Sequence, residues 1–186
     1  MVREALREAD TALRLDNMDS NVVGLAGCAV ADVGQPERAV PILKNAIDLN
    51  PNNGHAWAAL GSAYLILGKV DAAIDHLQRG VDVSPLDARL SIWYALLALA
   101  CLMAKDLDRA LAAARTGCQA NDRTYLPRIA EAAIHLASGD QAAAAGSLDE
   151  CYRVKPDLSQ NQIDRLLGPD LGAAMAALRS TAREAR

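Results

Sequence analysis

The fold of this chain is decided by residues Gly54–Asp87, which read GHAWAALGSAYLILGKVDAAIDHLQRGVDVSPLD. Their large apolar residues recur at spacings of three and four, which places them on one face of each of two helices. Gly61 and Ala73 are small enough to let these helices approach closely. Gly68 permits a tight turn between them, and Pro85 cannot continue the second helix. The stretch therefore predicts a helix–turn–helix unit.

The order and spacing of these residues resemble the signature of the tetratricopeptide repeat, a helix pair of about 34 residues. The signature positions are Trp57, Leu60, Gly61, Tyr64, Ala73, Leu77 and Pro85. One period earlier, the small and proline positions recur at Gly27, Ala39 and Pro51. Two copies in register, 20–53 and 54–87, predict that helix pairs stack into an array.

Two further copies follow, with one irregularity. Ala110 takes the place of Ala73 after 37 residues, so the third copy, 88–124, has a three-residue insertion. We expect the insertion to lengthen its first helix, over about residues 87–104. The fourth copy, 125–158, regains the period with Ala144 and Pro156.

The two ends of the chain depart from the repeat. Residues 1–19 match only a second helix, so they fit either a half repeat of a longer protein or an N-terminal cap. Ser159 and Gln162 form a capping-box pattern, and residues 159–186 are expected to form helices that cover the last repeat. The expected fold is all-α, a right-handed α-solenoid of four repeats with terminal capping helices.

The composition disfavours several other classes of protein. Aromatic residues make up 3% of the chain and Phe is absent, which argues against a β-sheet protein. The net charge of −4 argues against a nucleic-acid interface. No apolar run reaches the roughly 18 residues of a membrane span, and the N-terminus lacks a signal-peptide core. We therefore expect a cytoplasmic protein without membrane insertion.

Sequence patterns of metal sites and catalysis are missing. The cysteines show no CxxC spacing, which gives no reason to expect a metal or a cofactor. No Gly-rich phosphate loop, GxSxG or HExxH motif occurs. His55, His76 and His135 belong to different predicted helices. The chain is therefore not expected to be an enzyme.

The resemblance implies that a protein or peptide binds the concave face, which the first helix of each repeat lines. The residues expected to face this groove are Asn21, Cys28, His55, Ser62, Leu65, Ile92, Leu99, Leu102, Ile129 and Leu136. Only Asn21 is of the type that the family uses to clamp a terminal carboxylate, so we expect a shallow apolar groove. Three occupants fit it: an amphipathic partner helix, the chain's own C-terminal helices, or a second copy in a symmetric homodimer.

A closer resemblance rests on residues 83–87, on the lengthened helix expected after them, and on residues 163–167 together with 173–179. They look like the C-terminal repeat regions of bacterial signalling proteins, in which such a region follows a class III adenylate/guanylate cyclase domain or a winged-helix DNA-binding domain. This resemblance implies a regulatory or assembly module. Two other classes stay open: a stand-alone secretion-type chaperone that binds an unfolded client, and an enzyme, which would need a polar pocket.

Overall fold

The computed structural model describes residues 2–184, with side chains described as far as Ser180. These residues form helices and connecting turns, without a strand. The helices are α1 (Val2–Leu15), α2 (Ser20–Asp32), α3 (Pro36–Leu49), α4 (Gly54–Ile66), α5 (Val70–Val83), α6 (Leu90–Met103), α7 (Leu107–Ala120), α8 (Leu126–Ala137), α9 (Gln141–Val154), α10 (Gln160–Leu167) and α11 (Pro169–Glu184). None of the described helices combines the length and the apolar character needed to cross a membrane.

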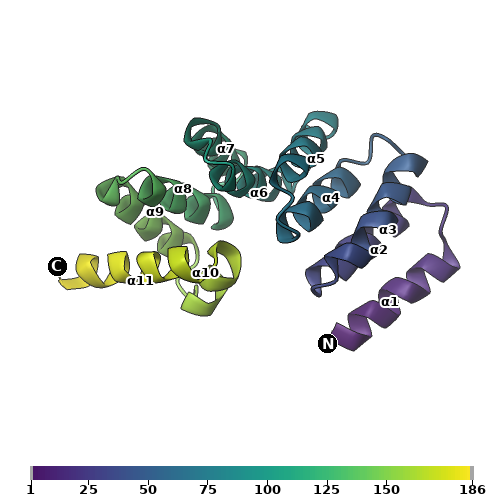
Figure 1. Cartoon of the computed structure of the whole chain (residues 1–186), viewed down its shortest axis with the longest axis horizontal. Coiled ribbons are helices and arrows are strands. Elements are labelled where there is room, and N and C mark those ends of the chain that lie inside the picture. The colour runs from purple at the N-terminus through teal and green to yellow at the C-terminus, as the bar shows by residue number, and fades with distance from the viewer. Residues whose placement is uncertain (1, 185–186) are drawn as a thin grey trace.

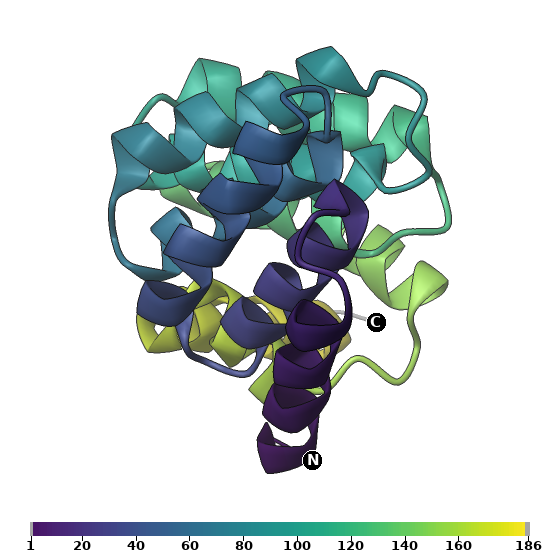
Figure 2. The ribbon, with the colours of Figure 1, turned by 90° about the vertical axis from the view of Figure 1, so that its right-hand side faces the viewer.

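The helices form a curved array of pairs (Figure 1). Each of the pairs α2–α3, α4–α5, α6–α7 and α8–α9 packs closely, and each pair stacks on the next. Helices α4 and α6 lie on the inner edge of the arch, whereas α5 and α7 lie on its outer edge. Seen from one end, the pairs lie one behind another (Figure 2). The expected α-solenoid is thereby confirmed.

Small residues hold the two helices of a pair close together. A Cβ atom added to Gly61 would lie 2.6 Å from Leu77 Cγ, and one added to Gly27 would lie 2.7 Å from Leu43 Cγ. The alanine that the second helix presents at this contact has no exposed surface in any of the four repeats: Ala39, Ala73, Ala110 and Ala144. The helices thus approach to a distance that larger side chains would prevent.

A buried hydrogen-bond network joins the first two repeats. The Ser20 hydroxyl donates to the carbonyl oxygen of Ala46 over 2.7 Å. The Asn53 amide donates to both the carbonyl oxygen and the hydroxyl of Ser20, over 3.0 and 2.8 Å. Asn53 also caps α4, because its side-chain oxygen accepts from the Ala56 N–H. Since buried polar groups are costly without partners, this network favours a single register between the repeats.

The turn inside each repeat places one residue in the left-handed backbone region. Gly34, Gly68 and Gly139 have φ values of 85°, 69° and 84°. Lys105 occupies the corresponding turn of the third repeat, with φ of 63°. A side chain in this region costs roughly 1–2 kcal/mol, so the third turn is strained where the other three are not.

The third repeat differs from the expectation. Helix α6 has 14 residues against 13 in α4, so the insertion does not add a helical turn. Most of it lies in the connection 84–89, which is longer than the connection 50–53. In this connection Asp87 accepts hydrogen bonds from the Arg89 backbone N–H, Nε and Nη2, over 2.8, 2.9 and 2.9 Å. Such local side-chain bonds stabilise a turn at the expense of helix.

Helices α10 and α11 cover the C-terminal end of the array. Leu158, Ile163 and Met175 are buried in one cluster with residues of α8 and α9. The predicted capping box is present: the Ser159 hydroxyl accepts from the Gln162 N–H, and the Gln162 side chain accepts from the Ser159 N–H. Gly168, with φ of 81°, allows the chain to turn sharply between the two helices.

Substitution of glycine by alanine should have opposite effects in two helices. Gly61→Ala should lower the free energy of unfolding by about 1–3 kcal/mol, because the new methyl group meets Leu77. Gly146→Ala should raise it by about 0.5–1 kcal/mol, because nothing lies within 4 Å of the new Cβ and alanine favours helix. Urea unfolding of both variants measures the difference. A Gly61→Ala variant as stable as the unmodified chain would contradict the packing described here.

The strained turn predicts a stabilising substitution. Lys105→Gly should raise the free energy of unfolding by about 1 kcal/mol, because glycine adopts positive φ without a steric cost. Gly68→Ala, at the matching position of the second repeat, should lower it by a similar amount. Thermal unfolding of the two variants would show opposite shifts in Tm; a loss of stability in Lys105→Gly would exclude strain at this turn.

Candidate functional site

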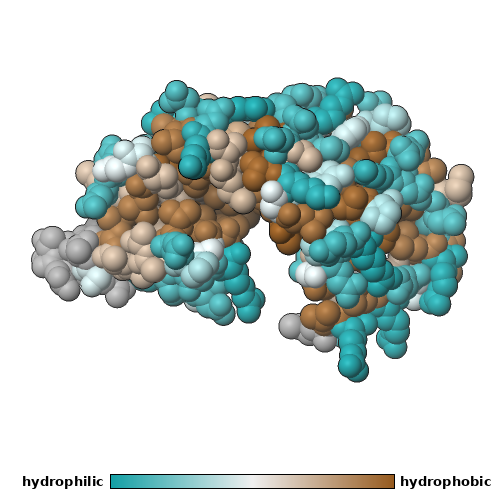
Figure 3. Space-filling view, viewed as in Figure 1, coloured by the Kyte–Doolittle hydropathy of each residue, from teal (hydrophilic) through white to brown (hydrophobic). Residues whose placement is uncertain are grey.

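An apolar groove lies between the inner helices α4 and α6 and the corner that joins α10 to α11. Its volume is about 750 Å³. Leucine side chains form its walls, with Ile66 and Met103 at its edge more than half exposed. Figure 3 shows hydrophobic side chains beside the opening of the arch and hydrophilic ones over the outer face. We call this feature the α4–α6 groove.

The structure brings four of the predicted concave-face residues together in this groove. They are Ser62, Leu65, Leu99 and Leu102, two each from α4 and α6. Leu65 and Leu102 are half-buried, whereas Leu99 is only 7% exposed and belongs mainly to the core. Ile66 and Met103, which the sequence reading missed, occupy matching positions one residue further along each helix.

The remaining predicted residues lie elsewhere. Asn21 and Ile92 are exposed on α2 and α6 without lining the groove. Leu136 is half-buried and packs against the cluster beneath the C-terminal helices. Ile129 has no exposed surface and belongs to that same cluster. Its prediction as a binding residue is therefore wrong, since α10 and α11 complete the core around it.

One wall of the groove comes from outside the repeats. This wall faces the leucines of α4 and α6 and consists of Arg165, Leu166 and Leu167 from α10 and Leu171 from α11. Leu166 and Leu167 are half-buried against both hydrophobic clusters of the molecule. The repeat period could not reveal these residues, because residues 159–186 have no counterpart in the repeats. The C-terminal helices thus border the groove on one side without filling it.

A polar cluster surrounds His55 at the beginning of α4. His55 is half-buried, and neither of its ring nitrogens has a hydrogen-bond partner among the described residues. Burial lowers the pKa of His55, and the nearby Arg89 guanidinium lowers it further. The hydrogen bonds from Arg89 hold the pKa of Asp87 below its ordinary value. The Arg89 guanidinium also lies 5.5 Å from the centre of the Trp93 ring, a cation–π contact that helps to hold Arg89 beside Asp87.

Cys28, another predicted groove residue, is half-buried on α2 beside Asp32. Burial raises the pKa of its thiol to about 12, with Asp32 adding to the effect. Its sulfur lies 3.7 Å from the Asp32 carboxylate. Because the thiolate is the nucleophile, the raised pKa makes Cys28 a poor nucleophile at neutral pH.

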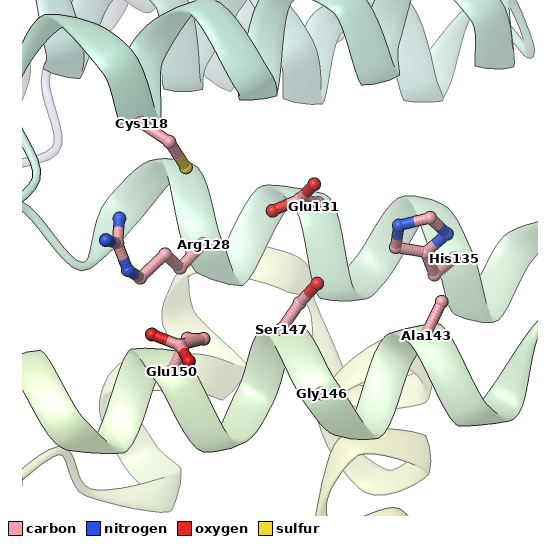
Figure 4. A pocket seen from close by; sticks show the side chains of 8 residues that line it. All are labelled: Cys118, Arg128, Glu131, His135, Ala143, Gly146, Ser147 and Glu150. Carbon is pink, nitrogen blue, oxygen red and sulfur yellow. The ribbon is translucent and has the colours of Figure 1, made fainter.

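A second, polar cavity of about 460 Å³ lies among α7, α8 and α9 (Figure 4). Arg128, Glu131 and His135 line it from α8, at the positions that hold Trp57, Leu60 and Tyr64 in the second repeat. Nε and Nη1 of Arg128 are buried without a hydrogen-bond partner in the described structure. Glu131 lies 3.5 Å from Arg115. These polar residues of the fourth repeat thus create a cavity in place of an apolar contact.

The polar side chains of this cavity come from α7, α8 and α9. Within residues 2–180, no hydrogen bond joins His135, Ser147 and Glu131, so a nucleophile paired with a base is missing. Burial raises the pKa of the Cys118 thiol, which makes it a poor nucleophile. No cluster of three or more potential metal ligands occurs among the described residues.

The buried imidazole predicts a pH dependence of stability. Because the pKa of His55 is lower in the folded chain than in the unfolded chain, the unfolded chain binds more protons below about pH 6.5. Stability should therefore fall as the pH drops from 7 towards 5, and His55→Gln should weaken this dependence. Urea unfolding at several pH values measures both curves. Parallel curves for the two proteins would rule out His55 as the source.

Comparison with known proteins agrees with this architecture. Residues 30–99 match the family model of the tetratricopeptide repeat. The chain is 25% identical over 154 residues to anaphase-promoting complex subunit 3 of Schizosaccharomyces pombe, an alignment that covers 83% of this chain. The alignment covers 23% of that protein, so the chain spans less than a quarter of this relative's length.

Solved structures show the same fold. The structure of TTC0263, a thermophilic TPR protein of Thermus thermophilus, superimposes with a TM-score of 0.76 at 19% identity, covering 95% of this chain and 90% of that one. YrrB, described as a TPR protein with an unusual peptide-binding site, gives a TM-score of 0.64 at 12% identity, covering 91% and 89%. Residues 30–99 thus match tetratricopeptide repeats in sequence, and the chain as a whole has the fold of a tetratricopeptide-repeat solenoid.

Proposed function

We propose that this chain is a protein-interaction module that binds an apolar segment of a partner protein in the α4–α6 groove. The observation that carries the proposal is the groove itself, in which leucines of two inner helices and of the C-terminal corner surround an open volume of about 750 Å³. Pockets of this size, with mostly apolar walls and few polar groups, are typical of binding sites.

The distribution of exposed apolar side chains supports this location. Four large ones lie on the first helices of the repeats, Leu25, Ile66, Ile92 and Met103, and two of these, Ile66 and Met103, line the groove. A structure with the same fold is described as having a peptide-binding site, which makes a peptide a reasonable occupant. The mixed charges of the cavity among α7, α8 and α9 give no comparable preference for one partner.

The wider role that we propose is regulatory. The sequence resembles the repeat regions of bacterial signalling proteins, and the one relative described above extends well beyond the aligned segment. In this proposal the chain connects a cyclase-like or transcriptional regulator to its partner in the cytoplasm.

Mass measurement by light scattering of the purified chain tests the further proposal that two copies pair through the same groove.

Charge at the edge of the groove should weaken binding. Peptides selected from a random phage-display library on the purified chain should bind the double variant Ile66→Lys/Met103→Lys at least about tenfold more weakly, because lysine at both sites would place charge against apolar peptide side chains. Both side chains are more than half exposed, so the variant should still fold. Fluorescence anisotropy with labelled peptides measures the affinities.

Leu86→Lys is the matched control for this experiment. Leu86 is 96% exposed in the connection before α6 and does not line the groove. The control should bind the selected peptides as the unmodified chain does. Equal binding by the groove variant and the control would show that the peptides use another surface.

A further inference from the structure

We infer that Arg165 makes the α4–α6 groove selective for a segment that carries an acidic side chain beside its apolar ones. The inference rests on the proposed function and adds the chemical character of the partner. It assigns this selectivity to the C-terminal helices, which lie outside the repeats.

The two inner helices contribute no charge. Neither α4 (Gly54–Ile66) nor α6 (Leu90–Met103) contains an Asp, Glu, Lys or Arg residue. Ser62 is the polar side chain that they place in the lining. A charged group of a partner therefore finds no counterion on this side of the groove.

The opposite wall contributes one charge, and it is positive. Arg165 lies in the last turn of α10 and is the charged residue of the lining. It is exposed and makes no ion pair with any acidic residue among the described side chains. Its neighbour Asp164 accepts a hydrogen bond of 2.7 Å from the Gln160 amide. The Arg165 guanidinium is thus available to a ligand.

An apolar surrounding increases the effect of this charge. Leu166, Leu167 and Leu171 flank Arg165, and the leucines of α4 and α6 face it. When a partner segment covers these side chains, water is displaced and the interaction between guanidinium and carboxylate becomes stronger. A lysine at the same place in the partner would lose hydration without gaining a counterion, which disfavours it. An acidic side chain of the partner is therefore favoured by its attraction to Arg165, and a lysine at the same place is disfavoured.

The test uses peptides selected by phage display on the unmodified chain. These peptides should carry Asp or Glu next to their apolar residues, and replacement of that residue by Lys should weaken binding about tenfold or more. On the variant Arg165→Glu the preference should reverse, so that the Lys form binds more tightly. Fluorescence anisotropy of each peptide with each protein gives the four affinities of a charge-swap cycle.

Arg79→Glu is the control for the change in net charge. Arg79 is exposed on the outer helix α5, and its substitution should leave the preference for the acidic peptide intact. If the two peptides bind equally to the unmodified chain, or if Arg165→Glu does not alter their order, the inference is wrong while the groove remains a binding site. If no selected peptide depends on Ile66 and Met103, the proposed function fails and the inference falls with it.

Discussion

The structure depends on the close approach of two helices within each repeat. Gly61 lies so near Leu77 that a methyl group added to Gly61 would have to push the Leu77 side chain aside. The buried alanine of each second helix likewise allows the two helices of every pair to lie close together. Once the pairs have this shape, each one leaves an apolar surface that the next must cover. The buried network of Ser20 and Asn53 then favours one register between the first two pairs. The curvature of the array, and with it an inner face, follows from this stacking.

Repeats two and four show what happens when the same scaffold carries different side chains. In the second repeat, His76 lies between Trp57 and Tyr64, with ring centres 5.4 and 5.1 Å apart, so the space between α4 and α5 is filled. In the fourth repeat Arg128, His135 and Ser147 take those three places and line an open cavity. Polar side chains keep their backbone positions but do not pack, because each needs hydrogen-bond partners that the neighbouring helix does not offer. The repeat tolerates this loss since its alanine contact at Ala144 remains buried.

The C-terminal helices contribute both to the core and to the α4–α6 groove. Ile163 and Met175 complete the core of the fourth repeat, while Leu166 and Leu167 a few residues away form a wall of the α4–α6 groove. The same short segment therefore covers the end of the solenoid and shapes its inner surface. The self-covered groove foreseen as one of three arrangements is present only in part, because the corner between α10 and α11 borders the open volume instead of filling it.

The sequence alone determined the repeat, since Gly61, Ala73 and Pro85 act through local geometry and recur at a fixed spacing. It also indicated the turn positions, the capping box at Ser159 and the inner location of Leu65 and Leu102. The repeat period did not reveal that the insertion before α6 forms a turn around Asp87, because this turn depends on local hydrogen bonds from Arg89. Tertiary structure alone decided that Ile129 is buried and that Arg165 faces the groove. These two facts depend on where α10 and α11 fold back on the array, and a repeat period carries no information about segments that lie outside it.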